Sequence, residues 1–273
     1  MSHLIEGTGR LNATRKRHCE LDSIVAALER EGGSSLALVL CREGELSPRA
    51  AKVLELAEGK GVAILVESAR EMRRMSEGET ASELIALEGP PLSASLAGLM
   101  SAEGPVFLLV GLRYPGNVGF IIRSAEVAGA AGVVLATQWK GTEKSEALRV
   151  GMRADRFFPV IESQAEEAIR EARAAGRRIV ALETTGARPL WDADLRRPNL
   201  IIVGGEAYGI DDTIIQSADE AFRIPTRGFI PSYNVQAAVA MVLGEWLRQE
   251  GQYGPEANPA DSRVASSPNR SRQ

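Results

Sequence analysis

The sequence predicts an α/β protein that consists of a smaller N-terminal α/β domain and a larger domain with a mostly parallel six-stranded sheet. Short apolar runs of strand length alternate with segments of helical periodicity, which is typical of strands covered by helices. The chain has 273 residues, enough for about two domains of ordinary size. Glycine and proline are concentrated at residues 89–104, between two such alternating series. We therefore place the boundary between the domains there.

The composition excludes several classes of protein. The chain is 44% hydrophobic and 25% charged, as expected for a globular protein, and no apolar run approaches the ~18 residues that span a bilayer. The N-terminus lacks the basic start and apolar core of a signal peptide. The two cysteines and two histidines are not spaced as metal ligands. We therefore expect a cytoplasmic protein without a metal site.

The N-terminal part begins with a polar, basic arm at residues 1–18, and a small α/β domain follows at residues 19–92. Apolar residues recur at i, i+3, i+4 and i+7 in the first segment of this domain, which predicts an amphipathic helix. The residues between Ser93 and Gly104 are small and interrupted by glycine, so we interpret them as a linker. The expected strands cover residues 36–41, 62–66 and 84–87, and the expected helices cover 19–31, 48–59 and 69–76.

The large domain is predicted at residues 105–252. Its apolar runs are continuous rather than alternating, which indicates strands buried on both faces of a parallel sheet. Residues 253–273 contain almost nothing to bury and are expected to be disordered. The expected strands are 106–110, 133–136, 157–161, 179–182, 200–203 and 221–224, and the expected helices are 117–130, 144–153, 165–175, 210–217 and 233–250.

Three strand-to-helix connections in this domain have unusual composition. Ligands of open α/β sheets bind at the carboxyl ends of the strands, where these connections lie. In the first, residues 114–123, Asn117 suits a helix N-cap, Gly116 and Gly119 allow a close backbone approach to a ligand, and Arg123 faces away from the apolar stripe. The second, residues 202–210, is a glycine turn that contains Glu206, and the third is the proline-rich stretch at 224–238.

Each connection alone also fits an ordinary structural feature. The first could be a capped helix with a solvated arginine, the second a tight turn, and the third a connection in which Ser232 caps the last helix. A strand followed by Gly204-Gly205 also leaves open a nucleotide-cofactor oxidoreductase. The spacing is not G-x-G-x-x-G, however, and Glu206 would repel a pyrophosphate.

In order, the three motifs are N-x-G-x-x-x-R at 117–123, G-x-E-x-x-G at 204–209 and I-P-x-x-G-x-x-x-S-x-N-V at 224–235. This set resembles the SpoU (TrmH-like) family of RNA ribose 2′-O-methyltransferases, within the wider class of knotted methyltransferases. The resemblance covers residues 106–246, and the N-terminal domain looks like the ribosomal-protein-like RNA-binding domain of some members. The residues that match the positions tied to activity are Asn117, Arg123, Glu206, Ser232 and Asn234.

The resemblance implies a trefoil knot, the cofactor S-adenosylmethionine, no metal, and a homodimer with each active site close to the partner subunit. It also implies a cofactor site made largely of backbone groups. The matching residues are Leu182, Thr184, Gly186, Val203, Gly204, Gly205, Glu206, Ile224, Thr226, Tyr233, Asn234 and Val235. The sequence departs from the family pattern at Gly205, where asparagine or serine is common, and at Tyr233, Gln236 and 150–154.

Methyl transfer to a hydroxyl is an in-line displacement, which depends on alignment and on a polarised nucleophile. Arginine does not normally lose its proton in a protein, so we expect Arg123 to stabilise a forming alkoxide or to anchor a phosphate rather than act as a base. Ser232 and Asn234 are expected to orient Arg123 and the ribose. Glu206 is expected to hold the loops by accepting backbone N–H groups.

The net charge of −4 argues against a surface covered in nucleic acid but leaves room for local basic patches. The expected substrate is structured RNA, and 23S-type ribosomal RNA is favoured over tRNA because of the extra N-terminal domain. A tRNA methyltransferase and a non-catalytic RNA-binding relative are the alternatives. The candidate RNA contacts are Arg10, Arg15, Lys16, Arg17, Lys140, Lys144, Arg149 and Arg153.

Overall fold

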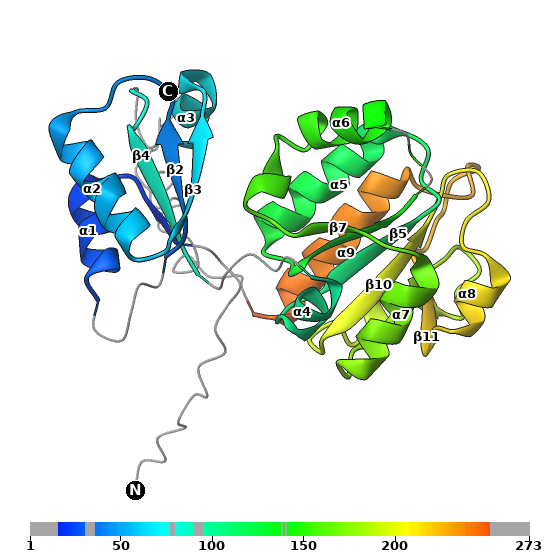
Figure 1. Ribbon diagram of the computed structural model, residues 1–273. Coiled ribbons are helices and arrows are strands. Elements are labelled where there is room, and N and C mark those ends of the chain that lie inside the picture. The colour runs from blue at the N-terminus through cyan, green and yellow to red at the C-terminus, as the bar shows by residue number, and fades with distance from the viewer. Residues whose placement is uncertain are drawn as a thin grey trace, which may run out of the picture.

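The structure is a computed structural model, and it describes residues 16–30, 36–76, 80–89, 95–137, 139 and 141–251. Figure 1 shows two α/β units, each built around its own sheet. The strand order is β1-β4-β2-β3 in the four-stranded sheet and β7-β6-β5-β10-β8-β11-β9 in the seven-stranded sheet. The α/β class and the parallel sheet predicted from the sequence are therefore confirmed.

In the small unit, β4 pairs antiparallel with β1 and β2, and β2 pairs parallel with β3. Two separate apolar clusters cover the sheet, one with side chains of α1 and α2 and one with side chains of α3. The elements are β1 Lys16–His18, α1 Leu21–Leu28, β2 Leu36–Arg42, α2 Pro48–Gly59, β3 Ala63–Glu67, α3 Ala69–Met75 and β4 Leu84–Glu88.

The basic arm predicted at residues 1–18 was wrong at its end, because Lys16–His18 form strand β1. Lys16, Arg17 and His18 pair with Glu88, Leu87 and Ala86. The polar sequence hid this strand, since only His18 of the three is buried. Residues 1–15, including Arg10 and Arg15, lie outside the described part of the chain.

A carboxylate secures the start of α2. Ser47 is the N-cap of this helix, and its hydroxyl accepts the N–H of Ala50. The side chain of Ser47 donates to Oε2 of Glu83, and its backbone N–H donates to Oε1, both at 2.7 Å. These two hydrogen bonds, that of the hydroxyl first, lower the pKa of Glu83 because they favour its charged form.

We predict that Glu83 stabilises the protein at neutral pH and loses this effect in acid. The pKa of Glu83 is lower in the folded state than the unfolded value of about 4.3, so the unfolded state binds more protons as the pH falls. The stabilisation is complete above the unfolded value and disappears as the pH falls through the folded one. Urea unfolding should show Glu83→Gln less stable than wild type at pH 7, with a smaller difference at pH 3.5. A difference that stays constant with pH would contradict this assignment.

The linker predicted at 93–104 was wrong in part, because it contains a helix that belongs to the core of the large unit. Helix α4 spans Leu96–Ser101 and starts at the N-cap Ser95. Leu99 and Met100 are buried in the apolar cluster beneath the large sheet. Sequence alone could not show this, since a six-residue helix is too short for a clear periodic pattern.

All strand pairs of the large sheet are parallel, and β5 and β10 lie near its centre. The strands are β5 Val106–Val110, β6 Gly132–Ala136, β7 Val160–Glu162, β8 Arg178–Leu182, β9 Arg188–Pro189, β10 Asn199–Gly204 and β11 Glu220–Arg223. The helices are α5 Pro115–Ala128, α6 Gly141–Val150, α7 Ala165–Ala174, α8 Asp212–Gln216 and α9 Val235–Gln249, with 3-10 turns at Ala154–Arg156 and Leu190–Asp192.

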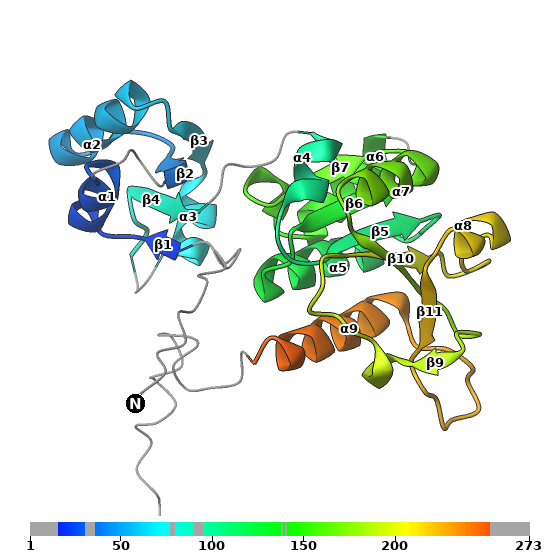
Figure 2. The same cartoon turned by 90° about the horizontal axis from the view of Figure 1, so that it is seen from below.

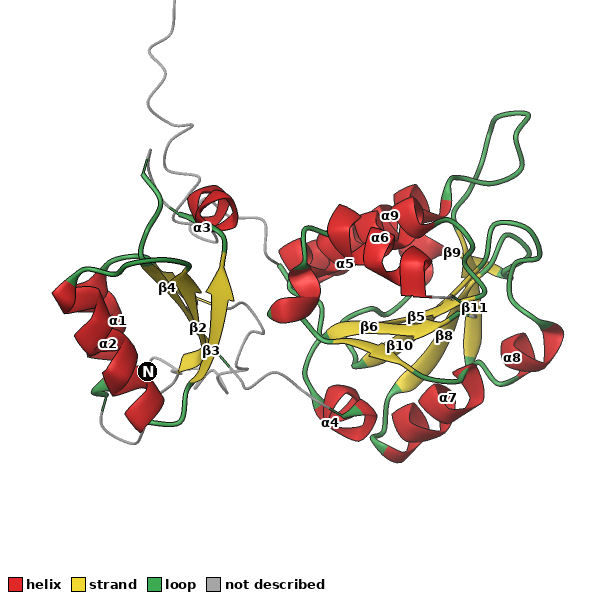
Figure 3. Ribbon diagram, turned by 45° about the horizontal axis from the view of Figure 1, so that its top comes forward, coloured by secondary structure: helices red, strands yellow, loops and turns green. Residues whose placement is uncertain are grey.

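The large unit has three layers, seen from the side in Figure 3. Helices α5, α6 and α9 cover one face of the sheet, and α4, α7 and α8 cover the other. Phe107 and Leu109 of β5 point into the first cluster, whereas Val106 and Leu108 point into the second. This burial on both faces explains the continuous apolar run of β5. Within the described residues, no helix is long and apolar enough to span a membrane.

The large unit differs from prediction in the bounds of β7 and α6, which were expected at 157–161 and 144–153, in its strand count and in the start of α5. The sheet has seven strands rather than six, because the two-residue β9 pairs with β11 at its edge. Helix α5 begins at Pro115, with Tyr114 as its N-cap, so Asn117 lies in the first turn and is not the cap. Proline suits this first helical position because its ring fixes φ and it has no N–H to satisfy.

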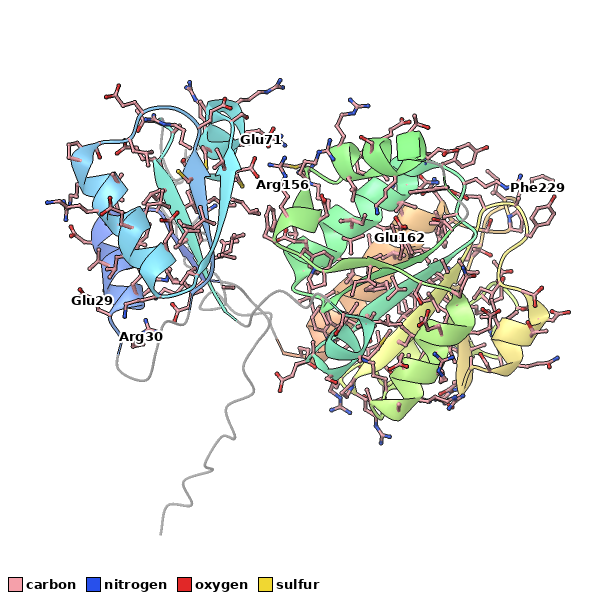
Figure 4. The ribbon with its side chains drawn as sticks, in the orientation of Figure 1. Glu29, Arg30, Glu71, Arg156, Glu162 and Phe229 are labelled. Atoms are coloured by element: carbon pink, nitrogen blue, oxygen red, sulfur yellow. The ribbon has the colours of Figure 1, made fainter. Side chains whose placement is uncertain are left out.

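The two units are in contact around Arg156 and Phe157. Arg156 forms an ion pair with Glu67, a side chain that is only 5% exposed at the end of β3. Beside it, Phe157 packs against the apolar cluster that lies under α3. Figure 4 shows Arg156 on the side of the large unit that faces the small one.

Candidate active site

A pocket opens at the carboxyl ends of β8, β10 and β11. Its volume is about 500 Å³. The same region, with the connection from β11 to α9 that forms part of its wall, can be followed in Figure 2. The lining residues are Leu182, Glu183, Thr184, Val203, Gly204, Gly205, Glu206, Gly209, Ile224, Thr226, Pro231, Ser232, Tyr233, Asn234, Val235 and Ala238.

Glycine forms one wall because the backbone segments there are in contact. A Cβ atom on Gly204 would lie 2.3 Å from the carbonyl carbon of Gly209, and one on Gly205 would lie 2.3 Å from the carbonyl oxygen of Gly111. Both contacts are with backbone, which cannot swing away as a side chain can. The asparagine or serine common at position 205 in the family would therefore require a shift of the loop after β5.

A hydrogen-bond network joins the three sequence motifs. The amide Nδ2 of Asn117 donates to Oε1 of Glu206 at 2.6 Å, and the backbone N–H of Arg113 donates to Oε2 at 3.2 Å. Nδ2 of Asn234 donates to Oδ1 of Asn117 at 3.3 Å. Since an amide has one acceptor end and one donor end, these contacts fix the orientation of Asn117. The chain Asn234–Asn117–Glu206 thus holds three loops that are far apart in the sequence.

The last helix is capped by Asn234, not by Ser232. Oδ1 of Asn234 accepts the backbone N–H of Gln236 at 2.9 Å, and α9 begins at the next residue, Val235. Asn234 therefore uses its oxygen as the cap and its nitrogen for the network. Ser232 is left exposed in the pocket wall. The hydroxyl of Tyr233 donates to the carbonyl oxygen of Pro225 at 3.4 Å and closes the base of the loop.

Arg123 is not brought to the pocket. It is exposed on α5 and is not among the lining residues. Gly119, which was predicted to let the backbone approach a ligand, packs against α6 instead. A Cβ on this residue would lie 2.5 Å from the carbonyl oxygen of Ala147. In this motif, therefore, Asn117 belongs to the site and Gly119 belongs to the helix packing.

The structure places all but one of the residues predicted for cofactor binding in the pocket wall. The exception is Gly186, which is buried against β11, where a Cβ would lie 2.4 Å from the carbonyl carbon of Phe222. Sequence reasoning missed Glu183, Gly209, Pro231 and Ala238. Gly209, Pro231 and Ala238 belong to the stretches already singled out at 202–210 and 224–238, and Glu183 lies between the matched residues Leu182 and Thr184, so the positions carried a usable signal.

Glu183 is the second carboxylate in the pocket wall. Its Oε1 accepts the backbone N–H of Thr184 at 2.8 Å and the hydroxyl of the same residue at 3.0 Å. Its Oε2 accepts the N–H of Ile210 at 3.3 Å. This carboxylate gives the end of β8 a fixed negative charge, which suits a positively charged ligand group.

The residues predicted to contact RNA are divided between the two units in the described part of the chain. Lys16 and Arg17 lie on β1 of the small unit, and Arg17 donates to the carbonyl oxygen of Met75 at 3.0 Å. On the large unit, Lys144 pairs with Glu162, while Arg153 has left-handed backbone angles with φ of 56°. Arg149 is exposed on α6, and Lys140 lies outside the described residues.

Comparison with known proteins identifies one family over this part of the chain. The sequence pattern of the SpoU rRNA Methylase family matches residues 104–244. This range contains the whole large sheet and all three loops of the network.

Individual relatives match over most of the chain. An "Uncharacterized tRNA/rRNA methyltransferase" of Mycobacterium ulcerans is 30% identical over 230 residues, which cover 81% of this chain and 73% of that protein. A "23S rRNA (guanosine-2′-O-)-methyltransferase" of Pseudomonas syringae is 28% identical and covers 82% of this chain and 92% of its own.

A similar fold occurs among solved structures. The crystal structure of an AdoMet-bound rRNA methyltransferase from Sinorhizobium meliloti has a TM-score of 0.53 and 23% identity, and the match covers 86% of this chain and 87% of that one.

Proposed function

Because the chain belongs to the SpoU rRNA methylase family, we propose that it transfers a methyl group from S-adenosylmethionine to a ribose 2′-hydroxyl of structured RNA. The observation that carries this proposal is the network that joins Asn117, Glu206 and Asn234 at the edge of the pocket. It places side chains of all three family motifs at one site. The 2′-O-methyltransferase from Pseudomonas syringae supports the same reaction.

The pocket fits the cofactor. Apolar side chains of Leu182, Val203 and Ile224 suit the adenine ring, and Gly204 presents backbone groups to the pocket because it has no side chain of its own. The carboxylate of Glu183 offers a partner for a positive group of the cofactor. When bound there, S-adenosylmethionine would supply an electrophilic methyl group on a sulfonium.

The side chains that neither the network nor the helix cap uses act on the ribose. The side chain of Asn234 is committed to Asn117 and to the helix cap, so it positions the loop. The hydroxyl of Ser232, exposed in the pocket wall, would hydrogen-bond the ribose or orient the partner subunit's Arg123. The guanidinium of Arg123 stabilises the forming alkoxide or anchors the neighbouring phosphate, since it keeps its proton.

A homodimer would bring Arg123 to an active site. Phe120, Arg123 and Val127 follow each other at spacings of three and four on the exposed side of α5. Phe120 is 47% exposed and Val127 is 75% exposed. An arginine between two exposed apolar side chains fits the edge of a protein interface. We place the partner subunit on this face of α5, close to the pocket, as the family resemblance implies.

The trefoil knot is proposed on the same grounds. In support, β11 returns beyond β8 to pair with β9, which belongs to the connection between β8 and β10. The chain after β10 therefore returns to its own earlier connection before α9 begins.

We also propose that the protein is located in the cytoplasm, because this location follows from the proposed RNA substrate.

We propose 23S-type ribosomal RNA as the substrate, with the small unit as an RNA-binding domain and tRNA as the alternative. The small unit has its own apolar clusters, so it is built as a separate domain. Deletion of residues 1–92 is expected to leave S-adenosylmethionine binding unchanged and to weaken binding to ribosomal RNA at fixed salt. Unchanged RNA affinity would show that the small unit has another role.

The reaction is tested by titration and by transfer of a labelled methyl group. S-adenosylmethionine should bind the purified protein, whereas NADP should not, and label from the methyl group should appear on ribose in total ribosomal RNA. Tight binding of NADP without S-adenosylmethionine would overturn the proposal in favour of an oxidoreductase. RNA binding without cofactor binding would instead indicate a non-catalytic relative.

A further inference from the structure

The exposed apolar side chains of this protein are concentrated around the pocket. Nine large hydrophobic side chains are exposed in the described part of the chain. Five of them lie on the three loops of the network: Tyr114, Tyr208, Phe229, Ile230 and Tyr233. Exposure of one such side chain is ordinary, but a group around a site marks a surface that binds something.

The most exposed of them is Phe229. It is fully exposed at 103%, and its neighbour Ile230 is exposed at 74%. Both lie in the connection between β11 and α9, in which Thr226 and Pro231, on either side of them, line the pocket. Figure 4 shows the ring of Phe229 pointing into solvent from this connection. The ring therefore stabilises nothing within the described chain, and its position depends on the same loop that shapes the pocket.

A second aromatic side chain lies on the neighbouring loop. Tyr208 is 84% exposed, and the guanidinium of Arg113 lies 5.2 Å from the centre of its ring. This loop, residues 205–209, lines the pocket as well. Arg227 is exposed two residues before Phe229. Each aromatic ring thus has an arginine near it, Arg113 from the connection after β5 for Tyr208 and Arg227 two residues before Phe229, a combination that attracts phosphate and stacks on bases.

We propose that Phe229 stacks on an unpaired base next to the nucleotide whose ribose enters the pocket, and that Tyr208 with Arg113 provides a second stacking position. This inference rests on the proposed function. Bases within an RNA helix have both faces covered by their neighbours, so only unpaired bases can accept these rings. The methylated nucleotide accordingly lies in a loop, a bulge or a single strand. Phe229 selects this nucleotide by stacking on the unpaired base next to it.

The proposal is tested by RNA binding, which does not depend on turnover. The probes are a single-stranded 15-nucleotide RNA of mixed sequence and the same sequence as a blunt duplex. Phe229→Ala should weaken binding to the single strand about 5- to 100-fold, the range expected when a stacked aromatic is removed, with little change for the duplex. Phe229→Trp should restore the affinity. Trp191→Ala is the matched control, because Trp191 is 52% exposed and does not line the pocket.

Two further measurements separate this inference from the function on which it rests. Affinity for S-adenosylmethionine should be the same in Phe229→Ala and wild type, and with ribosomal RNA the variant should raise KM more than it lowers kcat. If wild type binds no S-adenosylmethionine, the proposed function fails. If wild type binds cofactor and RNA but Phe229→Ala binds the single strand equally well, the stacking role is overturned. It is also overturned if the variant changes only the oligomeric state in light scattering, because the loop would then contact a second copy.

Discussion

Replacement of Arg123 by alanine is expected to reduce methyl transfer by about 10²- to 10³-fold, the loss typical when one group that stabilises developing negative charge is removed. Arg123 is exposed and does not line the pocket, so cofactor affinity should stay within twofold of wild type. The fold should also be unaffected, since the buried stripe of α5 is made by other residues. Transfer of labelled methyl from S-adenosylmethionine to ribosomal RNA measures the first effect, and calorimetric titration of the cofactor measures the second.

A matched control is available on α7, at the other face of the sheet. Arg170 is also an exposed arginine, so Arg170→Ala changes the net charge equally without touching a family motif or a candidate RNA contact. Arg123→Lys keeps the charge but loses the planar fork, so partial recovery would indicate charge stabilisation and no recovery would indicate bidentate anchoring of a phosphate. Equal turnover in Arg123→Ala and wild type would show that this arginine has been assigned wrongly.

The dimer interface proposed on α5 leads to a related prediction. If the partner subunit is needed to place Arg123, then Val127→Asp should lower the activity together with the dimer population, although Val127 lies outside the pocket. Phe229→Ala, in contrast, should leave the dimer intact. The two variants therefore distinguish a defect of assembly from a defect of RNA recognition.

The large domain could be predicted well because its strands are buried on both faces. Val106–Val110 has no polar residue and matches β5 at both ends. The strands at the edges of the two sheets were harder to predict. Strand β1 contains lysine, arginine and histidine, and β9 has two residues, so neither gives an apolar signal. These strands exist because a neighbouring strand offers free backbone groups, which is a tertiary effect.

The candidate site could be located from the sequence, but its contacts could not. The motifs placed Asn117, Glu206 and Asn234 near each other, yet the sequence assigned the N-cap of α5 to Asn117 and considered Ser232 for that of α9. In the structure, Asn117 is released from capping because Pro115 begins the helix, and its amide is free to join the network. Which polar group caps a helix and which one meets another loop depends on distances across the fold, and residue type alone does not determine them.

The buried Arg177 is a structural feature that the sequence did not indicate. It is only 3% exposed, and its five N–H donors meet five backbone carbonyl oxygens. Nε donates to Met100 and one Nη donates to Gly104, both at 2.7 Å. The remaining acceptors are the carbonyls of Leu99, Ala102 and Asn199. An arginine more than 70 residues away in sequence thus holds the end of α4 against the large sheet.

This arrangement stabilises a charge without a carboxylate. The carbonyls at the end of α4 carry the negative end of the helix dipole, and Arg177 donates to three of them, those of Leu99, Met100 and Ala102. Burial lowers the pKa of Arg177 to about 10, which leaves the guanidinium protonated at neutral pH. All five donors are used, so the cost of removing this cation from water is offset by hydrogen bonds to a charged group, worth about 1.5–3 kcal/mol each.

Arg177→Ala is therefore expected to lower the free energy of unfolding by about 3–5 kcal/mol, because each buried carbonyl left without a donor costs about 1–3 kcal/mol and Leu99 keeps its donor from Ala102. The five carbonyls would lose the guanidinium, and α4 would lose its attachment to the sheet. The free energy of unfolding of Arg177→Lys should lie between those of wild type and Arg177→Ala, because an ammonium has three donors and no planar fork. Arg197→Ala is the control, since Arg197 is 70% exposed and its pair with Asp194 is worth at most about 1 kcal/mol. Urea unfolding of wild type and the three variants measures the order of their free energies of unfolding. Hydrogen exchange should show α4 losing protection first. A loss below about 1 kcal/mol for Arg177→Ala would mean that water replaces the guanidinium and that the packing of Leu99 and Met100 alone holds α4 in place.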